Sequence, residues 1–277
     1  MLMYYKKPLL LLSLLYISLQ GWATETEETF PDEIILVPVA TSPEPENAEV
    51  KILSPIEGDI KTINPVKIQL DVQGLSLGTQ SILSRETEIA HEPGIETLHV
   101  IVDNHPYFEI YQEIVDASIG EQSPNLNQRI DFTIPFTLEP GMHILRIFPA
   151  QSFQEGMKAK AVFATRSFYF KMRKNNPEFD LTRPYLTYNQ PQGKYEYKID
   201  EPILLDFYVS NCTLSSTDYK IRLTIDNSFI QILTDWTPYY INGMKKGAHK
   251  IELELLDPNN KPVPGMLNHV QRVITLY

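Results

Sequence analysis

The 277-residue chain carries 35 aspartates and glutamates against 24 lysines and arginines, for a formal net charge of −11. This acidic balance excludes the broad positive surface that binding to nucleic acid or to anionic lipid requires. Cys212 is the only cysteine, so no intramolecular disulfide can form. Burial of apolar side chains therefore has to hold the fold together.

The first 23 residues follow the three-part pattern of a secretory signal peptide. Lys6 and Lys7 form a short positive region, residues 8–19 are almost wholly apolar, and Gly21-Trp22-Ala23 places small residues at a cleavage site. A membrane anchor, the alternative, needs an apolar run of roughly 20 residues, and this run is shorter. We expect cleavage after Ala23 and export to the periplasm, the cell surface or the medium. The mature chain is then expected to have no membrane span.

Residues 24–48 have the composition of a linker. They are rich in acidic residues and proline and contain no lysine or arginine. Such a segment buries too little apolar surface to offset the entropy of ordering it. We predict an extended or disordered linker, in which the apolar patch at 34–37 either docks on a neighbour or is a sticky point.

From Val50 onward, apolar and polar residues alternate with a period of two, which is typical of strands with one buried face. Turn sequences such as Asp103-Asn104 and Asp226-Asn227 separate the strands. Helical periodicity is nearly absent, with residues 79–90 as the one weak candidate. The pattern predicts an all-β chain of short antiparallel strands, built as a sandwich or barrel. The alternation is clearest in four segments: 66–72, 203–209, 221–225 and 251–255.

The sequence contains an internal repeat. Segment 98–104 aligns with 221–227, and a long alternating strand precedes each copy. After each copy, a Gly-x-His step leads into a further strand, at Gly141-Met142-His143 and at Gly247-Ala248-His249. The period is too long for a solenoid and suits duplicated domains. We predict two domains, at 49–173 and at 182–277.

The order of these motifs resembles that of bacterial immunoglobulin-like (or fibronectin III-like) envelope modules. Such modules often show a Val-Asp-Gly hairpin followed by a Pro-Gly-x-His strand. Both copies here carry asparagine at the glycine position, Asn104 and Asn227, and either residue tolerates the positive φ of a hairpin turn. The resemblance covers residues 49–277. It implies two tandem immunoglobulin-like antiparallel β-sandwiches and no particular activity.

Gly74-Leu75-Ser76-Leu77-Gly78 matches the Gly-x-Ser-x-Gly nucleophile elbow of serine hydrolases. A real elbow needs a strand-turn-helix in a parallel α/β sheet, an oxyanion loop, and a downstream acid and histidine. Helical patterns are nearly absent here, and no glycine-rich oxyanion loop is present. The motif is therefore interpreted as a turn. The chain is predicted not to be an enzyme and to need no cofactor.

Histidines raise the question of a metal site. His99 and Asp103 share one strand face, and each copy contributes one Gly-x-His histidine, His143 and His249. Only the aspartate recurs in the second copy, where it is explained as a hairpin residue. No zinc or calcium ligand spacing occurs. We expect no metal site, and we expect His143 and His249 to hydrogen-bond locally beside the turn.

Aromatic residues are the remaining indication of function, because exposed rings stack on sugar faces or anchor a protein partner. A buried tryptophan fills the core of many such sandwiches, which is the competing interpretation of Trp236. Consecutive strand residues face opposite ways, so one of Tyr239 and Tyr240 must point outward. The residues selected as binding candidates are Trp236, Tyr239, Tyr240, Tyr107 and Tyr111.

Three functions follow from these observations. The first is a non-catalytic exported module of the cell envelope, binding or structural, that recognises an envelope protein through loops at 75–93 and 113–128 or through sheet faces. The second is a module that binds cell-wall polysaccharide through outward aromatic rings. The third is a periplasmic chaperone-like protein that lends a strand to a client. A chaperone needs a basic anchor between its domains, and the one basic cluster is at 171–174.

Overall fold

The computed structural model describes residues 33–91, 94–111, 128–174, 176 and 179–277. In these ranges the chain is all-β, with 3-10 helices η1 (Ser84–Thr87) and η2 (Met266–Asn268) as its helical elements. Neither helical element has the length and apolarity to span a membrane. The predicted signal peptide, the first part of the predicted linker and most of the 113–128 loop lie outside the described residues.

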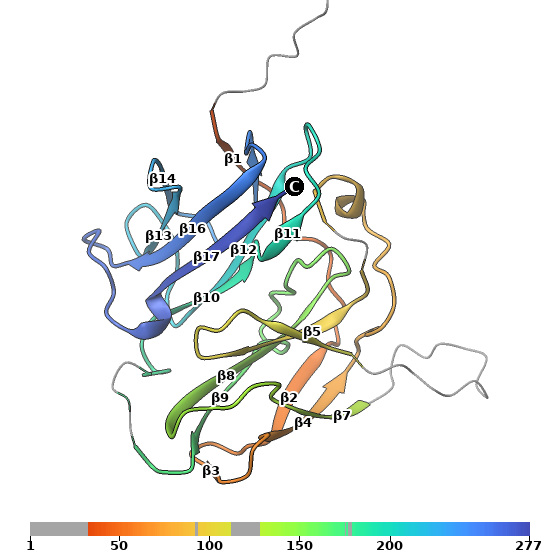
Figure 1. The fold of residues 1–277 in the computed structure, drawn as a ribbon, viewed down its shortest axis with the longest axis vertical. Coiled ribbons are helices and arrows are strands. Elements are labelled where there is room, and N and C mark those ends of the chain that lie inside the picture. Colours follow the sequence, from red (N-terminus) through yellow and green to blue (C-terminus); the bar gives the residue numbers. More distant parts are fainter. Residues whose placement is uncertain (1–32, 92–93, 112–127, 175, 177–178) are drawn as a thin grey trace, which may run out of the picture. The chain divides into compact units, whose positions relative to one another are not determined.

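The first sandwich pairs a three-stranded sheet with a five-stranded sheet (Figure 1). Inward side chains from both sheets, among them Ile68, Leu98 and Phe168, form one core, as alternation along each strand requires. The smaller sheet has the order β2-β4-β7, with bounds Glu49–Ser54, Lys67–Gln73 and Gln128–Thr133. The larger sheet has the order β3-β9-β8-β5-β6, with bounds Ile60–Lys61, Ala164–Phe170, Gly141–Ala150, Thr97–Val102 and Phe108–Ile110.

The second sandwich repeats this plan with a four-stranded and a five-stranded sheet. Its smaller sheet has the order β1-β15-β12-β10, with bounds Ile35–Pro38, Tyr239–Asn242, Ile203–Ser210 and Tyr185–Gln190. Its larger sheet has the order β11-β17-β16-β13-β14, with bounds Gly193–Tyr195, His269–Leu276, Gly247–Leu256, Lys220–Ile225 and Phe229–Leu233. The two larger sheets have corresponding strand orders, with one parallel edge pair in each and antiparallel pairs elsewhere. The all-β sandwich architecture that the alternation predicted is what the chain adopts.

The repeated hairpin carries the same hydrogen bonds in both copies. Asp103 and Asp226 have positive φ angles of 54° and 51°. The Nδ1 atom of His143 lies 2.8 Å from Asp103 Oδ2, and that of His249 lies 2.7 Å from Asp226 Oδ2. In each copy the other ring nitrogen lies 2.7 Å from the carbonyl oxygen four residues earlier. The local role predicted for both histidines is confirmed.

Strand β1 corrects the prediction of a disordered linker. Residues 35–38 precede the first sandwich in the chain, yet they pair antiparallel with β15 of the second sandwich. Ile34 and Leu36 pack against the core of that sandwich, and Val39 N–H donates to Pro238 O at 2.9 Å. The acidic, proline-rich residues around the patch suggested disorder, but four residues with apolar side chains suffice to complete a sheet edge. Docking of the apolar patch, the alternative interpretation, is what the structure shows.

The two sandwiches, which belong to one compact unit of residues 31–277, touch through sheet faces. We call this interface the junction. The outward side chains of β5 and β8 meet those of β10 and β12, so these strands are buried on both faces. Phe148 and Phe163 lie 4.5 and 4.7 Å, centroid to centroid, from the ring of Tyr208. The outward residues in question are almost fully buried: His99, Ile101, Arg146, Phe148, Thr187, Asn189, Asp206 and Tyr208.

Arg146 is a fully buried cation in this junction. Its Nη1 atom donates to Leu186 O at 3.0 Å and to Thr187 Oγ1 at 2.8 Å, and its Nη2 atom donates to Asp103 O. Burial lowers the pKa of Arg146 to about 10, which still leaves it charged at neutral pH. The guanidinium thus joins the hairpin of the first sandwich to the backbone of β10 in the second.

The corresponding face of the second sandwich is polar. Where the first copy has His99 and Ile101 on β5, the aligned second copy has Arg222 and Thr224 on β13. On the next strand the second copy has Glu254, which pairs with Arg222 across the sheet. These side chains remain partly exposed. The outward face of the larger sheet is buried in the first copy and partly exposed in the second, where Arg222, Thr224 and Glu254 occupy it.

Gly156 allows a steric test of the junction. Its N–H donates to Asp206 Oδ2 at 3.0 Å, and a Cβ atom there would lie 2.2 Å from Tyr208 Oη and 2.9 Å from the ring. Gly156→Ala is expected to lower the free energy of unfolding by about 1–3 kcal/mol through overpacking, measured by urea denaturation. In a Tyr208→Leu background the penalty should shrink, because the clashing ring is gone. An equal penalty in both backgrounds would show that Gly156 does not act through the junction.

Candidate functional site

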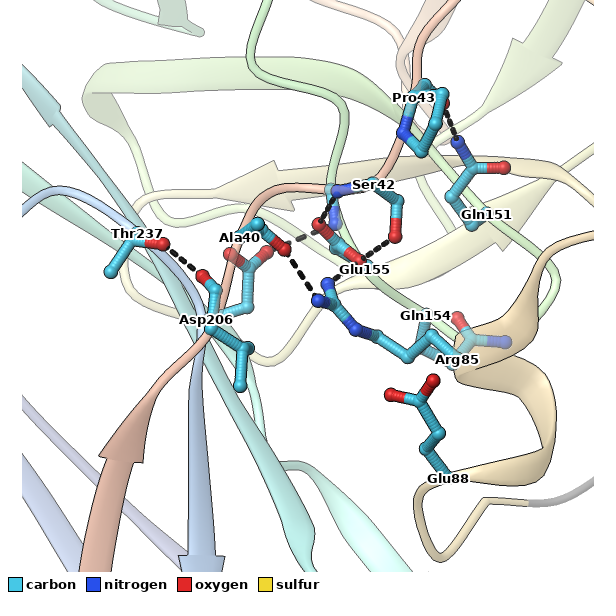
Figure 2. A network of polar contacts seen from close by, with 12 residues as sticks. Ala40, Ser42, Pro43, Arg85, Glu88, Gln151, Gln154, Glu155, Asp206 and Thr237 are labelled. Carbon is cyan, nitrogen blue, oxygen red and sulfur yellow. Dashed lines mark hydrogen bonds and ion pairs between the residues drawn. The ribbon is translucent and has the colours of Figure 1, made fainter.

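The chain between β1 and β2 crosses the junction (Figure 2). We call residues 39–48 the crossing segment. Ala40 O accepts a hydrogen bond from Arg85 Nη2 at 2.5 Å. Ser42 donates twice to the carboxylate of Glu155, from its N–H at 2.9 Å and from its Oγ at 2.6 Å. The chain thus first pairs with the second sandwich through β1, and its crossing segment is then hydrogen-bonded by side chains of the first sandwich.

Arg85 and Glu155 form a buried ion pair, with 8% and 1% of their side-chain surfaces exposed. Arg85 Nε also donates to Tyr240 Oη at 3.0 Å, and Tyr240 Oη donates to Glu88 at 2.6 Å. Burial lowers the pKa of Arg85, but the charge of Glu155 and the bond to Tyr240 outweigh burial and raise that pKa above its ordinary value. Through its bond to Tyr240, Arg85 links η1 of the first sandwich to β15 of the second.

Asp206 is the second buried carboxylate of the junction. It has no exposed surface and accepts hydrogen bonds from Lys158 Nζ, Gly156 N–H and Asn189 Nδ2, the last two at 3.0 and 2.7 Å. Lys158 lies 4.9 Å from the centroid of the Tyr208 ring. A buried charge is tolerated when it is paired and its lone pairs are met, and both conditions hold here.

His99 extends this network toward the surface. Its Nδ1 atom lies 2.7 Å from Asn189 Oδ1, its Nε2 atom lies 2.7 Å from Gln154 Oε1, and its ring stacks on Tyr107 at 3.7 Å. Complete burial lowers the pKa of His99 to about 4, so the ring is neutral at pH 7. Within the described ranges, no three His, Cys, Asp or Glu side chains lie close enough together to hold a metal ion.

A cavity of about 170 Å³ opens beside this network, and we call it the junction pocket. Both sandwiches contribute to its wall. Its apolar side includes Ile89, Phe153 and Leu204. The ionisable and carboxamide side chains of the wall are His91, Glu109, Gln154, Gln190, Gln192 and Lys194.

Two of these carboxamides are held in place by the protein itself. Gln190 Nε2 donates to Tyr107 Oη at 2.7 Å, and Gln190 Oε1 accepts from Tyr195 Oη at 2.7 Å. Gln192 bonds the backbone of Tyr107 on both sides, at 3.1 and 3.0 Å. This part of the wall is therefore rigid before any ligand arrives, which reduces the entropy that binding costs.

Three other groups of the wall keep bonding capacity. His91 Nδ1 lies 3.2 Å from Ile89 O and donates to that carbonyl, and the Nε2 atom is buried without a hydrogen-bond partner among the described residues. Burial raises the pKa of Glu109, although a bond from Gln154 opposes the rise. Lys194 is exposed at the rim. The pocket wall thus contains an imidazole, a carboxyl group and an ammonium group.

The five aromatic candidates do not form one surface. Tyr107 lines the junction pocket, and Tyr240 points out of the core to bond Arg85 and Glu88. Tyr239 is a core residue whose hydroxyl donates to Asp235 O at 2.8 Å. The prediction that one of these two neighbours points outward is confirmed. Tyr111 is exposed and is not part of the pocket wall.

Trp236 does not fill the core, contrary to the competing interpretation. It is 41% exposed, and its Nε1 atom donates to Phe207 O at 3.0 Å. Its ring centroid lies 6.3 Å from that of Tyr208. Tyr239 and Phe207, which stack at 6.4 Å, occupy the core instead.

The Gly-x-Ser-x-Gly segment is a loop that follows β4. Gly74 and Gly78 have φ angles of 67° and 85°, and a Cβ atom on Gly74 would lie 2.6 Å from Asn47 O. Leu75 and Leu77 are buried in the first core. Glycine is needed here for turning and for close approach of backbone, as the turn interpretation holds.

Sequence reasoning missed the charged members of the junction. One signal was present. Residues 203–209 contain a single charged residue, Asp206, and the side chains on the same face as Asp206 include Leu204 and Tyr208. A strand that is apolar on both faces is typical of burial on both sides. A lone acid within such a strand indicates a buried, paired carboxylate.

Removing the carboxylate of Glu155 should reveal how much the junction contributes to stability. Glu155→Ala leaves Arg85 buried and unpaired, so the free energy of unfolding is expected to fall by about 3–5 kcal/mol. Glu254→Ala is the matched control, because it breaks the more accessible pair with Arg222 and should cost about 1 kcal/mol or less. Chemical denaturation measures both. Equal losses would contradict a structural role for the buried pair.

His99 predicts a dependence of stability on acid pH. Its pKa is about 4 when folded and near 6.5 when unfolded, so the unfolded chain binds the extra proton between these values. The free energy of unfolding should therefore fall as pH drops from 6.5 to 4, by on the order of 3 kcal/mol for this residue. A His99→Gln variant should lose this component, whereas His105→Gln should keep it. Parallel pH profiles for wild type and His99→Gln would refute the assignment.

Comparison with known proteins assigns no family. No family model and no curated protein matches the chain. The fibronectin(III)-like modules of Clostridium thermocellum CbhA match at 11% identity and a TM-score of 0.27, over 82% of this chain and 93% of that chain. Dimeric latent PorU from Porphyromonas gingivalis matches at 12% identity and a TM-score of 0.25, over 86% and 20%. SGBP-B of the Bacteroides ovatus mixed-linkage glucan utilization locus, in complex with a mixed-linkage heptasaccharide, matches at 13% identity and a TM-score of 0.22, over 84% and 71%. These scores are too low to transfer a site or a function.

Proposed function

We propose that this chain is an exported, non-catalytic binding module of the cell envelope whose ligand enters the junction pocket. One observation carries the proposal: carboxamides that the protein itself holds in place line a cavity to which both sandwiches contribute. Concave, pre-formed sites with a few placed polar groups are typical of ligand-binding sites. The pattern of the first 23 residues supports export.

The ligand class follows from the size and the two-sided wall of the pocket. At about 170 Å³ it is smaller than the roughly 300–1,000 Å³ of pockets for drug-sized ligands. It therefore takes a small ligand or the end of a longer one. Amide, carboxyl and ammonium groups provide both donors and acceptors, and Phe153 and Leu204 provide an apolar side. A sugar ring, with hydroxyl groups at its edge and C–H groups on its faces, matches this wall, so we propose the terminal sugar of a cell-wall polysaccharide.

The other two functions receive less support. The described part of the 75–93 loop supplies Arg85 to the buried ion pair and Ile89 and His91 to the pocket wall, so it is committed to the junction. A chaperone would need an accessible basic anchor between the sandwiches. Arg85, Arg146 and Lys158 are the basic groups buried there, and each bonds this chain's own acceptors.

Calorimetric titration with a panel of mono- and oligosaccharides tests the proposal. The mature chain, residues 24–277, should bind one member or more, and His91→Ala or Lys194→Ala should weaken that binding at least about tenfold, a loss of about 1.4 kcal/mol. His269→Ala and Lys261→Ala are the matched controls, because both residues are exposed on the second sandwich outside the pocket wall. Binding that the pocket variants leave unchanged would place the site elsewhere. No binding to any sugar would reject the carbohydrate class.

A further inference from the structure

The larger sheet of the second sandwich ends in a free edge. Strand β14 pairs with β13 on one side, in a regular register from Ile225↔Phe229 to Ile221↔Leu233. No described strand pairs with its other side. An unpaired edge of this kind presents a row of backbone donors and acceptors to any strand that approaches it.

The edge lacks the features that normally prevent such pairing. Folded proteins protect edge strands with lysine, proline, a bulge or short length. Strand β14 reads Phe-Ile-Gln-Ile-Leu, with no charge, no proline and no shift in its register. The corresponding edge strand of the first sandwich, β6, is three residues long and carries Glu109 at its centre. Within one chain, therefore, one copy of this edge is protected and the other is not.

Two exposed side chains mark the same edge. Ile230 is 59% exposed and Ile232 is 40% exposed, and they share the outer face because they are two residues apart. Phe229 packs against the core and Leu233 is buried, so the inner face of the strand is already filled. The remaining apolar surface of β14 is therefore available to a partner strand.

We propose that β14 pairs antiparallel with β14 of a second copy of this chain, about a two-fold axis at Gln231. In this register Ile230 lies opposite Ile232 of the second copy, and the two Gln231 side chains face each other. Every apolar side chain of the outer face meets another apolar side chain, and no like charges are opposed within the strand. A chain with a net charge of −11 repels its own copies over most of its surface, so an uncharged strand is where two copies can approach.

The self-complementary register is the reason to choose a second copy over a foreign strand. Cross-strand pairs of β-branched residues are among the favourable ones in antiparallel sheets, and this register forms two of them by symmetry. Pairing would join the β14-containing sheet of one copy and the same sheet of the second copy into one continuous sheet. The junction pocket takes Lys194 and Tyr195 from β11, which lies at the opposite edge of the same sheet from β14. The inference therefore does not depend on the proposed ligand.

Sedimentation velocity of the mature chain, residues 24–277, over a wide range of concentration tests the proposal. The wild type should shift from monomer to dimer as concentration rises, and Ile232→Lys should remain monomeric, because it opposes an apolar residue and brings charges together. Val273→Lys is the matched control: Val273 is 60% exposed on β17 of the same sheet, away from the edge. It should dimerise like the wild type. A wild type that stays monomeric throughout, or an Ile232→Lys variant that dimerises normally, would overturn the proposal.

A cross-link fixes the register independently of affinity. In a Cys212→Ser background, Gln231→Cys places two thiols directly opposite each other, at a separation that a disulfide can bridge. Mild oxidation should give a covalent dimer of Gln231→Cys and none of Ile63→Cys, a control at an exposed residue of the first sandwich. Dimers of the wild type without a cross-link at Gln231→Cys would also overturn the proposal, because they would form through a different surface.

Discussion

Two carboxylates enclosed between the sandwiches set the constraint on which the rest of the structure depends. Glu155 and Asp206 are almost completely removed from water, so their charges must be met inside the protein. Arg85 and Ser42 meet the first, and Lys158 and Asn189 are among the groups that meet the second. Asp206 belongs to the second sandwich and Lys158 to the first, so sliding of one sandwich over the other would leave these two charges unpaired. Arg85 and Glu155 both belong to the first sandwich, and Arg85 reaches the second through Tyr240. These buried polar contacts therefore specify one arrangement of the sandwiches more than they add to its stability.

The two sandwiches are alike beside their hairpins and differ on the outward faces of their larger sheets. The Asp-His hydrogen bonds beside the hairpin are the same in both, since they serve the turn itself. The outward face of the larger sheet has diverged: apolar Ile101 and Phe148 pack on the neighbouring sandwich, whereas the aligned face of the second copy is charged. The aligned face of the second copy therefore does not take part in the junction.

The sequence was informative where local pattern decides structure and uninformative where tertiary contacts do. Period-two alternation predicted the strands, and the repeat predicted two sandwiches, because these features depend on neighbours in the chain. Strand β1 escaped prediction because its four residues gain their stability from β15, about 200 positions away. Alternation required Tyr239 and Tyr240 to face opposite ways, but the pairing of β15 with β12 decided which faced inward. The junction pocket combines residues of β6, β10, β11 and β12 with loops of both copies, a juxtaposition that no local pattern contains.

The path of the chain through β1 has a mechanical consequence. A pull on the N-terminal end of the described chain would reach the second sandwich first, through the ladder between β1 and β15, and not the first sandwich that follows in sequence. Under load, β1 and the crossing segment are the elements that can peel away while both cores stay closed. Fully extended, residues 35–48 span about 45–50 Å in total. Tension on the N-terminal end is therefore expected to act on the β1–β15 pairing before it acts on either core.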